Sequence, residues 1–261
     1  MSQTFLSSLP ELFPAGSVVL FTGDSITHGG RGGDMNHYLG HGYAAEIAMR
    51  YLGYMPDRGL QFANRGVSGD TSGRLVARWR EDAFPFTPCE TGYGSAFPES
   101  ANHPLVPDFL SILVGVNDLL GDRRTTPGEY ERNLRFMVED ARRAKPSVTI
   151  ILCEPFRMPL LPGDEIIGRQ EIVGRLAREC GLVHVPFQRL FSDILPRLNR
   201  NPGYWFWDTA HPTYAAHIHM ADFWIRSVAA ALAPRSNGQE GGDGGAVGVG
   251  GEARLDARAG V

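Results

Sequence analysis

The 261-residue sequence predicts an α/β protein built on a doubly wound parallel sheet. Three observations predict it: short apolar runs rich in β-branched residues, helical patterns that alternate with them, and a 43% hydrophobic content, enough for one well-buried core. Such alternation implies right-handed crossovers between parallel strands, with helices on both faces of the sheet. Ligands of sheets of this kind bind at the carboxyl ends of the strands.

Five apolar runs are the expected strands. Continuous apolar runs are typical of parallel strands that helices cover on both faces. The strongest are FLSILV and VTIILC, and LVHV is the shortest. The expected strands are residues 17–22, 60–64, 109–114, 148–153 and 182–185.

Six segments between and after these runs are the expected helices. The segment at 126–144 opens with Thr-Pro, a capping residue followed by proline at the first helical position. The last segment is long and rich in Ala, Ile and Trp. The expected helices are residues 43–52, 72–81, 126–144, 166–180, 187–198 and 212–232.

Two segments interrupt this alternation. Residues 83–104 are rich in Pro, Gly, Ser and aromatic residues, and a loop of this length suggests a lid, a substrate wall or a subunit contact. Residues 236–261 are Gly-rich and poor in large apolar residues, so we expect a disordered tail. The prediction is one domain over residues 1–235 with an insertion at 83–104.

Charge and composition argue against several classes of protein. The net charge of −4 and the lack of a basic run disfavour a nucleic-acid binder. No uncharged apolar stretch reaches about 18 residues, so no membrane span is expected. The N-terminus lacks Lys and Arg and does not resemble a secretory signal. The three widely spaced cysteines suggest free thiols, and together these features predict a cytoplasmic protein.

Ser25 follows the first expected strand in the segment LFTGDSITHGG. A serine hydroxyl attacks only when a base takes its proton. Gly-Asp-Ser alone also fits a turn or a helix cap, and the G-x-S-x-G elbow of α/β-hydrolases is absent. Ser25 is therefore a candidate nucleophile that needs a partner.

His211 is the candidate base among the eight histidines. Asp208 precedes it by three residues, so the carboxyl can reach Nδ1 and leave Nε2 free for a serine. The pattern D-x-x-H-P alone fits a capping Asp and a loop His equally well. His41, with His28 and His37, lies in the loop after the first strand and could contact substrate. His217 and His219 are two apart on the last helix and face different sides, so they are not a metal pair.

Donors for a developing oxyanion also follow the expected strands. Gly69 lies in the Gly-rich turn NRGVSGD, where a backbone N–H could point at the oxyanion. Asn117 ends the segment VGVN, and its side-chain amide would be a further donor beside the N–H of Ser25. Each fragment alone also fits an ordinary turn or cap.

The four blocks in order, G-D-S-I, G-x-S-G-D-T, G-x-N-D and D-x-x-H-P, resemble the SGNH hydrolase superfamily, also called GDSL esterases and lipases. The resemblance implies a flavodoxin-like three-layer α/β/α sandwich of about five parallel strands and a serine esterase without metal or cofactor. It implies Ser25, Asp208 and His211 as the catalytic residues, and Ser25, Gly69 and Asn117 as the oxyanion hole.

Three further segments, GHGY at 40–43, RWRED at 78–82 and EPF at 154–156, resemble the branch that contains bacterial acetylxylan esterases. That branch implies removal of short acyl groups, such as acetyl, from carbohydrate. Asp24, Trp205 and Trp207 are candidate substrate contacts, although either tryptophan could instead pack in the core. The insertion at 83–104 departs from the branch.

The expected partner is a small-molecule or oligosaccharide ester, and a homo-oligomer stays open. One alternative is a lipase, lysophospholipase or thioesterase of the same superfamily that acts on longer acyl chains. Its acyl channel would use aromatic residues of the insertion: Phe84, Phe86, Tyr93 and Phe97. The other alternative is a non-catalytic carbohydrate-binding or scaffold protein, which an intact Ser25, Asp208 and His211 disfavours.

Overall fold

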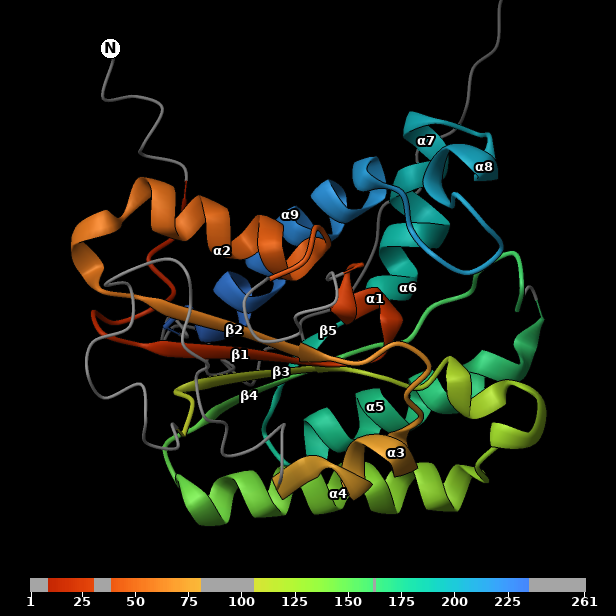
Figure 1. The fold of residues 1–261 in the computed structure, drawn as a ribbon, viewed down its shortest axis with the longest axis horizontal. Helices are drawn as coiled ribbons and strands as arrows, with labels where there is room; N and C mark the ends of the chain where they lie inside the picture. Colours follow the sequence, from red (N-terminus) through yellow and green to blue (C-terminus); the bar gives the residue numbers. More distant parts are fainter. Residues whose placement is uncertain (1–8, 31–38, 81–105, 162, 235–261) are drawn as a thin grey trace, which may run out of the picture.

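The computed structural model describes residues 9–30, 39–80, 106–161 and 163–234. In this part of the chain, five parallel strands form one sheet in the order β2-β1-β3-β4-β5 (Figure 1). This is the flavodoxin-like order, and the predicted fold class is confirmed. Every expected run forms a strand, with ends shifted by at most two residues. The strands are β1 (Val18–Gly23), β2 (Gln61–Gly66), β3 (Phe109–Leu113), β4 (Thr149–Cys153) and β5 (Val183–Val185).

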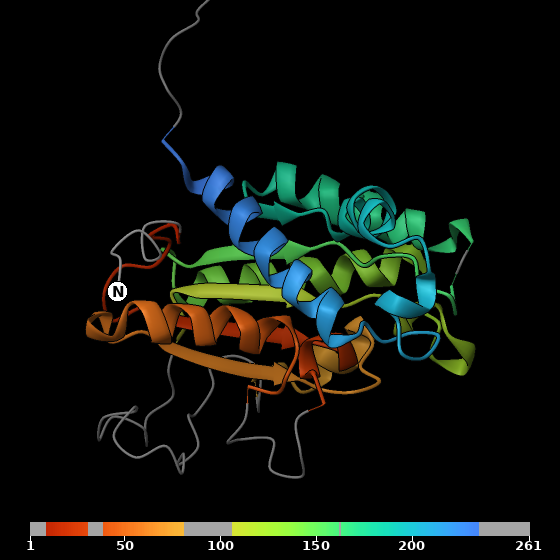
Figure 2. The ribbon, with the colours of Figure 1, turned by 90° about the horizontal axis from the view of Figure 1, so that it is seen from above.

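Helices cover both faces of the sheet. Helices α2 and α9 lie side by side on one face, and α3, α4 and α5 lie on the other (Figures 1 and 2). Side chains of the buried strand β1 alternate between the two faces of the sheet. Val19 and Phe21 pack toward α2 and α9, and Val18 and Leu20 pack toward α4. The helices are α2 (Tyr43–Tyr54), α3 (Ser72–Ala77), α4 (Pro127–Ala144), α5 (Ile167–Glu179) and α9 (Tyr214–Leu232).

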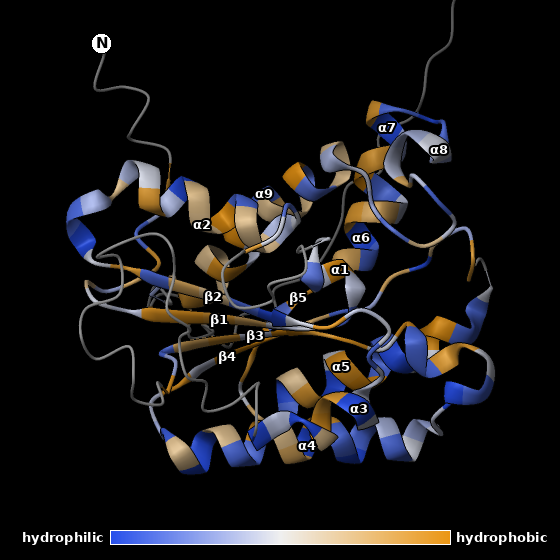
Figure 3. Ribbon diagram, in the orientation of Figure 1, coloured by the Kyte–Doolittle hydropathy of each residue, from blue (hydrophilic) through white to orange (hydrophobic). Residues whose placement is uncertain are grey.

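The start of α4 matches the sequence prediction. The Thr126 hydroxyl accepts from the Glu129 N–H at 3.2 Å, and the Glu129 carboxylate accepts from the Thr126 N–H at 2.7 Å. This reciprocal pair is a capping box, with Pro127 at the first helical position. Figure 3 shows hydrophilic residues along α4 and apolar residues in the strands above it.

The expected helix at 187–198 is wrong as a single element. The chain instead forms α6 (Phe187–Arg189), a π-helical turn η8 (Leu190–Ile194) and α7 (Leu195–Leu198). Pro196 explains the interruption, because it has no N–H to donate to the preceding turn of an α-helix. The expected helix at 72–81 also ends earlier, since α3 stops at Ala77.

Two short α-helices of the described residues were not predicted: α1 (Ser25–His28) and α8 (Pro202–Trp205). The insertion at 83–104 and the tail at 236–261 lie outside the described residues, as do Phe84, Phe86, Tyr93 and Phe97 of the expected acyl channel. No helix in the described ranges is long and apolar enough to cross a membrane. Cys153 and Cys180 are free thiols.

Candidate active site

Ser25 opens helix α1, one residue beyond the end of the interior strand β1. The end of β1 requires glycine at position 23. Gly23 has a φ of +151°, and an added Cβ would lie only 1.9 Å from the Leu113 carbonyl oxygen, so no larger residue fits. Asp24 then caps α1, its carboxyl accepting from the Ile26 N–H at 3.0 Å. The sequence Gly-Asp-Ser therefore ends a strand, caps a helix and presents a serine.

His211 and Asp208 lie in the loop between α8 and α9. Phe206 and Pro212 form an isolated antiparallel bridge across the base of this loop, and the Trp207 N–H donates to the His211 carbonyl at 3.1 Å. Within the loop, Asp208 Oδ1 accepts from the N–H of Ala210 at 2.7 Å and of His211 at 2.6 Å. These bonds hold the aspartate and the histidine in one rigid turn.

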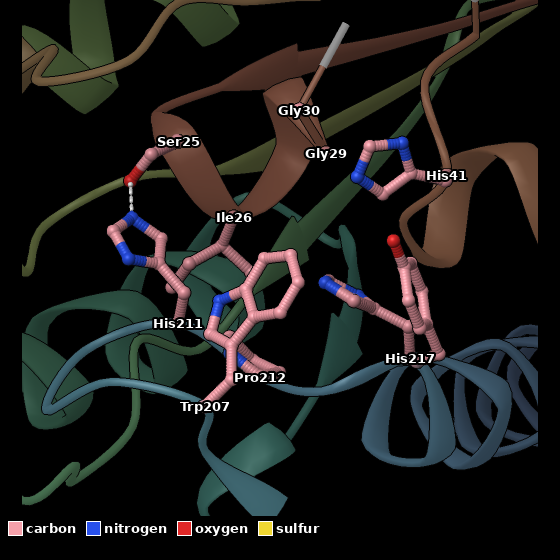
Figure 4. Close-up of a pocket in the computed structure, with 10 residues that line it drawn as sticks. Ser25, Ile26, Gly29, Gly30, His41, Trp207, His211, Pro212 and His217 are labelled. Carbon is pink, nitrogen blue, oxygen red and sulfur yellow. Dashed lines mark hydrogen bonds between the residues drawn. The ribbon is translucent and has the colours of Figure 1, made fainter.

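The structure brings Ser25, His211 and Asp208 together in one chain of hydrogen bonds. The Ser25 Oγ lies 2.9 Å from His211 Nε2, as the dashed line in Figure 4 marks, and His211 Nδ1 lies 2.7 Å from Asp208 Oδ2. Partial burial pushes the pKa of Asp208 upward, but the bonds from the Ala210 N–H and from His211 outweigh it and hold that pKa below its usual value. The carboxyl is therefore ionised and can orient the imidazole.

The three expected oxyanion donors follow three adjacent strands. Gly69 lies after β2, Ser25 after β1 and Asn117 after β3, and Gly23 pairs with both Gly66 and Leu113 at the ends of these strands. Among the described residues, neither the Ser25 N–H nor the Gly69 N–H has an acceptor. The Asn117 amide donates one hydrogen to the Asp70 carbonyl at 2.9 Å, which leaves its second hydrogen.

Asp24 is not a substrate contact in this structure, which corrects the sequence prediction. Asp24 is only 1% exposed, and its carboxyl caps α1. Burial raises the pKa of Asp24 to about 7; the bond from the Ile26 N–H opposes this shift, and the nearby charges of Asp118 and Asp70 add to it. Asp24 therefore contributes to the site by capping the helix that Ser25 opens.

Arg78 and Trp79, two residues of the RWRED segment, make structural hydrogen bonds and do not line the pocket. The Arg78 guanidinium donates to Asp70 at 2.7 Å and to the Arg65 carbonyl at 2.8 Å, at the end of β2. Trp79 is fully buried and donates to Asp140 at 3.2 Å. Arg78 thus stabilises the end of β2, and Trp79 connects its segment to α4.

A small pocket opens beside Ser25 and His211 (Figure 4). Trp207 lines it and is 58% exposed, whereas Trp205 is 5% exposed and donates to the Asn199 carbonyl within the core. Of the two tryptophans, only Trp207 is therefore placed to touch a ligand. His41, which the sequence placed near substrate, also lines the pocket.

Two further residues of the pocket wall were missed from the sequence, Tyr214 and His217. Both stand on the first turns of α9, three residues apart and therefore on one side of that helix. The signal that could have found them is this spacing directly after His211. His219 instead packs against Trp205, so the expectation that His217 and His219 face different sides is confirmed. No cluster of three metal-ligating side chains exists among the described residues.

Residues 21–217 match the sequence profile of the GDSL-like Lipase/Acylhydrolase family. The chain therefore belongs to this family and is a serine ester hydrolase. The resemblance seen in the four sequence blocks is confirmed.

Similar proteins include an acetylxylan esterase from Geobacillus stearothermophilus, 30% identical over 233 residues that cover 82% of this chain and 94% of that protein. The structure resembles that of the Geobacillus acetylxylan esterase Axe2, with a TM-score of 0.65, 28% identity and coverage of 82% and 95%. It also resembles LAE5, an alpha/beta hydrolase enzyme from the metagenome of Lake Arreo in Spain, with a TM-score of 0.67, 27% identity and coverage of 86% and 100%.

Axe2 variants described as catalytic mutants replace a serine, an aspartate and a histidine with alanine, and the aspartate precedes the histidine by three positions. Another variant replaces the tryptophan directly before that aspartate, in a protein described as an acetyl-xylooligosaccharide esterase.

Proposed function

We propose that Ser25 is the nucleophile of this esterase, that His211 is its general base and that Asp208 orients the imidazole. The observation that carries this proposal is the continuous path of hydrogen bonds, 2.9 Å from Ser25 to His211 and 2.7 Å from His211 to Asp208. The spacing of Asp208 and His211 also equals that of the aspartate and histidine changed in the catalytic mutants of Axe2.

The reaction is acyl transfer in two halves. Ser25 Oγ attacks the ester carbonyl while His211 Nε2 takes its proton, and the N–H groups of Ser25 and Gly69 with the Asn117 amide stabilise the oxyanion. The alcohol leaves with the proton from His211. Water then attacks the acyl-enzyme by the same route, which releases the acid and restores Ser25.

The substrate that we propose is an acetyl or similarly short acyl ester carried on carbohydrate. The support is the 30% identity to an acetylxylan esterase over most of both chains. Trp207 precedes Asp208 as the variant tryptophan precedes the aspartate of Axe2, and its exposed ring offers a surface on which a sugar can stack. His41, Tyr214 and His217 add polar groups to the pocket wall.

The test compares p-nitrophenyl acetate with p-nitrophenyl octanoate, followed by acetylated xylo-oligosaccharides. We expect a strong preference for acetate and acetate release from the oligosaccharide. Ser25→Ala should lower kcat by about 10³-fold or more, as for other serine hydrolases. A preference for octanoate would instead assign the enzyme to lipid or thioester substrates, and near-normal turnover by Ser25→Ala would overturn the mechanism.

A further inference from the structure

His217 is a polar group of the pocket that the proposed mechanism does not use. Its ring lies across the pocket from the Ser25–His211 pair and points into it from α9 (Figure 4). The residue is only 6% exposed, although it lines the pocket.

The hydrogen bonds of His217 fix its tautomer. The backbone N–H of Tyr43, the first residue of α2, donates to His217 Nδ1 at 3.1 Å. A backbone N–H can only donate, so Nδ1 must carry a lone pair and the proton of the neutral ring must be on Nε2. Burial, with the neighbouring charges of His41 and His211, lowers the pKa of His217 to about 4, so the ring is neutral near pH 7.

The Nε2–H is left without a partner. Within the described parts of the chain no acceptor bonds to it, and it is not among the enclosed side-chain atoms that lack a partner, so it stays accessible from the pocket. An accessible donor on a largely buried side chain favours a ligand that brings an acceptor, because an apolar group placed against it would leave the donor desolvated and unpaired.

We propose that His217 Nε2–H donates to an oxygen of the alcohol part of the substrate, a sugar hydroxyl or ring oxygen, and thereby selects acetylated polyols over acetates of plain alcohols. This inference rests on the proposed function. In an acetyl ester the carbonyl oxygen is assigned to Ser25, Gly69 and Asn117, and the methyl group accepts nothing. The remaining acceptors are therefore those of the alcohol part.

The experiment compares two secondary acetates on six-membered rings, a monoacetate of methyl β-xyloside and cyclohexyl acetate. The quantity measured is the ratio of their kcat/KM values, sugar acetate over cyclohexyl acetate. The variant is His217→Asn, because the Asn carbonyl can still accept from the Tyr43 N–H while the shorter side chain no longer reaches the pocket with a donor. His219→Asn is the matched control, since His219 stands on the same helix but packs against Trp205.

The expected result is that His217→Asn lowers this ratio about tenfold, the worth of one neutral hydrogen bond, while His219→Asn leaves it unchanged. An unchanged ratio in His217→Asn, with sugar acetate still a good substrate, overturns the role of His217 and leaves the proposed function standing. A wild-type enzyme that does not deacetylate the sugar overturns the proposed function and this inference with it.

A second measurement needs no variant and applies even where His217→Asn does not fold. Wild-type enzyme is assayed on monoacetates of methyl β-xyloside that lack one free hydroxyl each, and on the carbocyclic analogue that lacks the ring oxygen. We expect kcat/KM to fall about tenfold when the oxygen that meets His217 is removed. Equal values for the whole series overturn the inference.

Discussion

At the residue scale, the orientation of His211 depends on Asp208. One carboxyl oxygen meets the ring and the other accepts two backbone N–H groups of the same turn. The aspartate therefore fixes both the loop and the tautomer of His211, with Nδ1 protonated and Nε2 facing Ser25.

Asp208→Asn separates these two roles. An amide oxygen can keep the backbone bonds of the loop, but it cannot stabilise the imidazolium that forms when His211 takes the proton. We expect kcat on p-nitrophenyl acetate to fall at least about 10²-fold, less than for Ser25→Ala, with little change in Tm. Asp164→Asn, at an exposed aspartate paired with Arg157, serves as control. A kcat within a few-fold of wild type would mean that another group orients His211.

Asp24 makes stability depend on pH. Its pKa is about 7 in the folded protein and about 4 when unfolded, so between these values the native state holds a proton that the unfolded state has lost. Stability due to this group therefore falls as the pH rises from about 4 to 7, and the full cost of a buried carboxylate remains above pH 7.

Asp24→Asn should remove that cost while keeping the cap, since asparagine caps helices as well as aspartate does. We expect a higher Tm than wild type at pH 8, by at least about 2 °C, the shift that 1 kcal/mol gives at this chain length, and a difference that shrinks toward pH 4.5. Thermal unfolding at both pH values checks it. An equal or lower Tm at pH 8 would contradict the raised pKa of Asp24.

At the element scale, the short helix α1 is held against the end of β2. Asn64 donates to the Thr27 carbonyl at 2.7 Å and to the Leu39 carbonyl at 2.8 Å. Gly66 permits the close approach, since an added Cβ would lie 2.4 Å from the His28 backbone nitrogen. The contact between α1 and β2 therefore sets the position of Ser25.

Gly66→Ala should displace α1 and with it Ser25. A misplacement of about 1 Å can cost about 10²-fold in rate, so we expect kcat/KM to fall by at least tenfold and Tm to drop. The matched control is Gly53→Ala in α2, where an added Cβ meets nothing within 4 Å and alanine is the better helix former. Wild-type kcat/KM in Gly66→Ala would show that the position of α1 does not depend on this contact.

The helices and strands that could be predicted are those that a local sequence pattern, such as an apolar run or a helix cap, marks directly. The apolar runs gave the strands, and Thr126-Pro127 gave the start of α4. The helix at 187–198 was predicted as one element because its apolar period continues through Pro196, whose missing N–H interrupts the backbone bonds. The helix α1 is a single turn, too short for any period to indicate.

At the scale of the whole molecule, the strand order places the site. The connection after β1 leads to β2 on one side, and the connection after β3 leads to β4 on the other. The carboxyl ends of β1 and β3 therefore lie where the strand order reverses, the usual ligand site of such sheets. Residues after three successive strands, Ser25, Gly69 and Asn117, were therefore predictable as neighbours. Asp208 and His211 followed from their spacing.

What the sequence could not predict depends on packing between distant segments. Asp24 precedes Ser25, yet its burial comes from the junction of β1, α1 and the loops after β2 and β3. The tautomer of His217 is fixed by the Tyr43 N–H, 174 positions away in the chain. No local pattern carries such a contact.

The most direct test of the central claim, that Ser25 is the nucleophile, is mass spectrometry of the enzyme after reaction with a fluorophosphonate. We predict one adduct per chain on the peptide that contains Ser25, no adduct in Ser25→Ala and strongly slowed labelling in His211→Ala. Labelling of another serine, or none in an enzyme that hydrolyses p-nitrophenyl acetate, would contradict the claim.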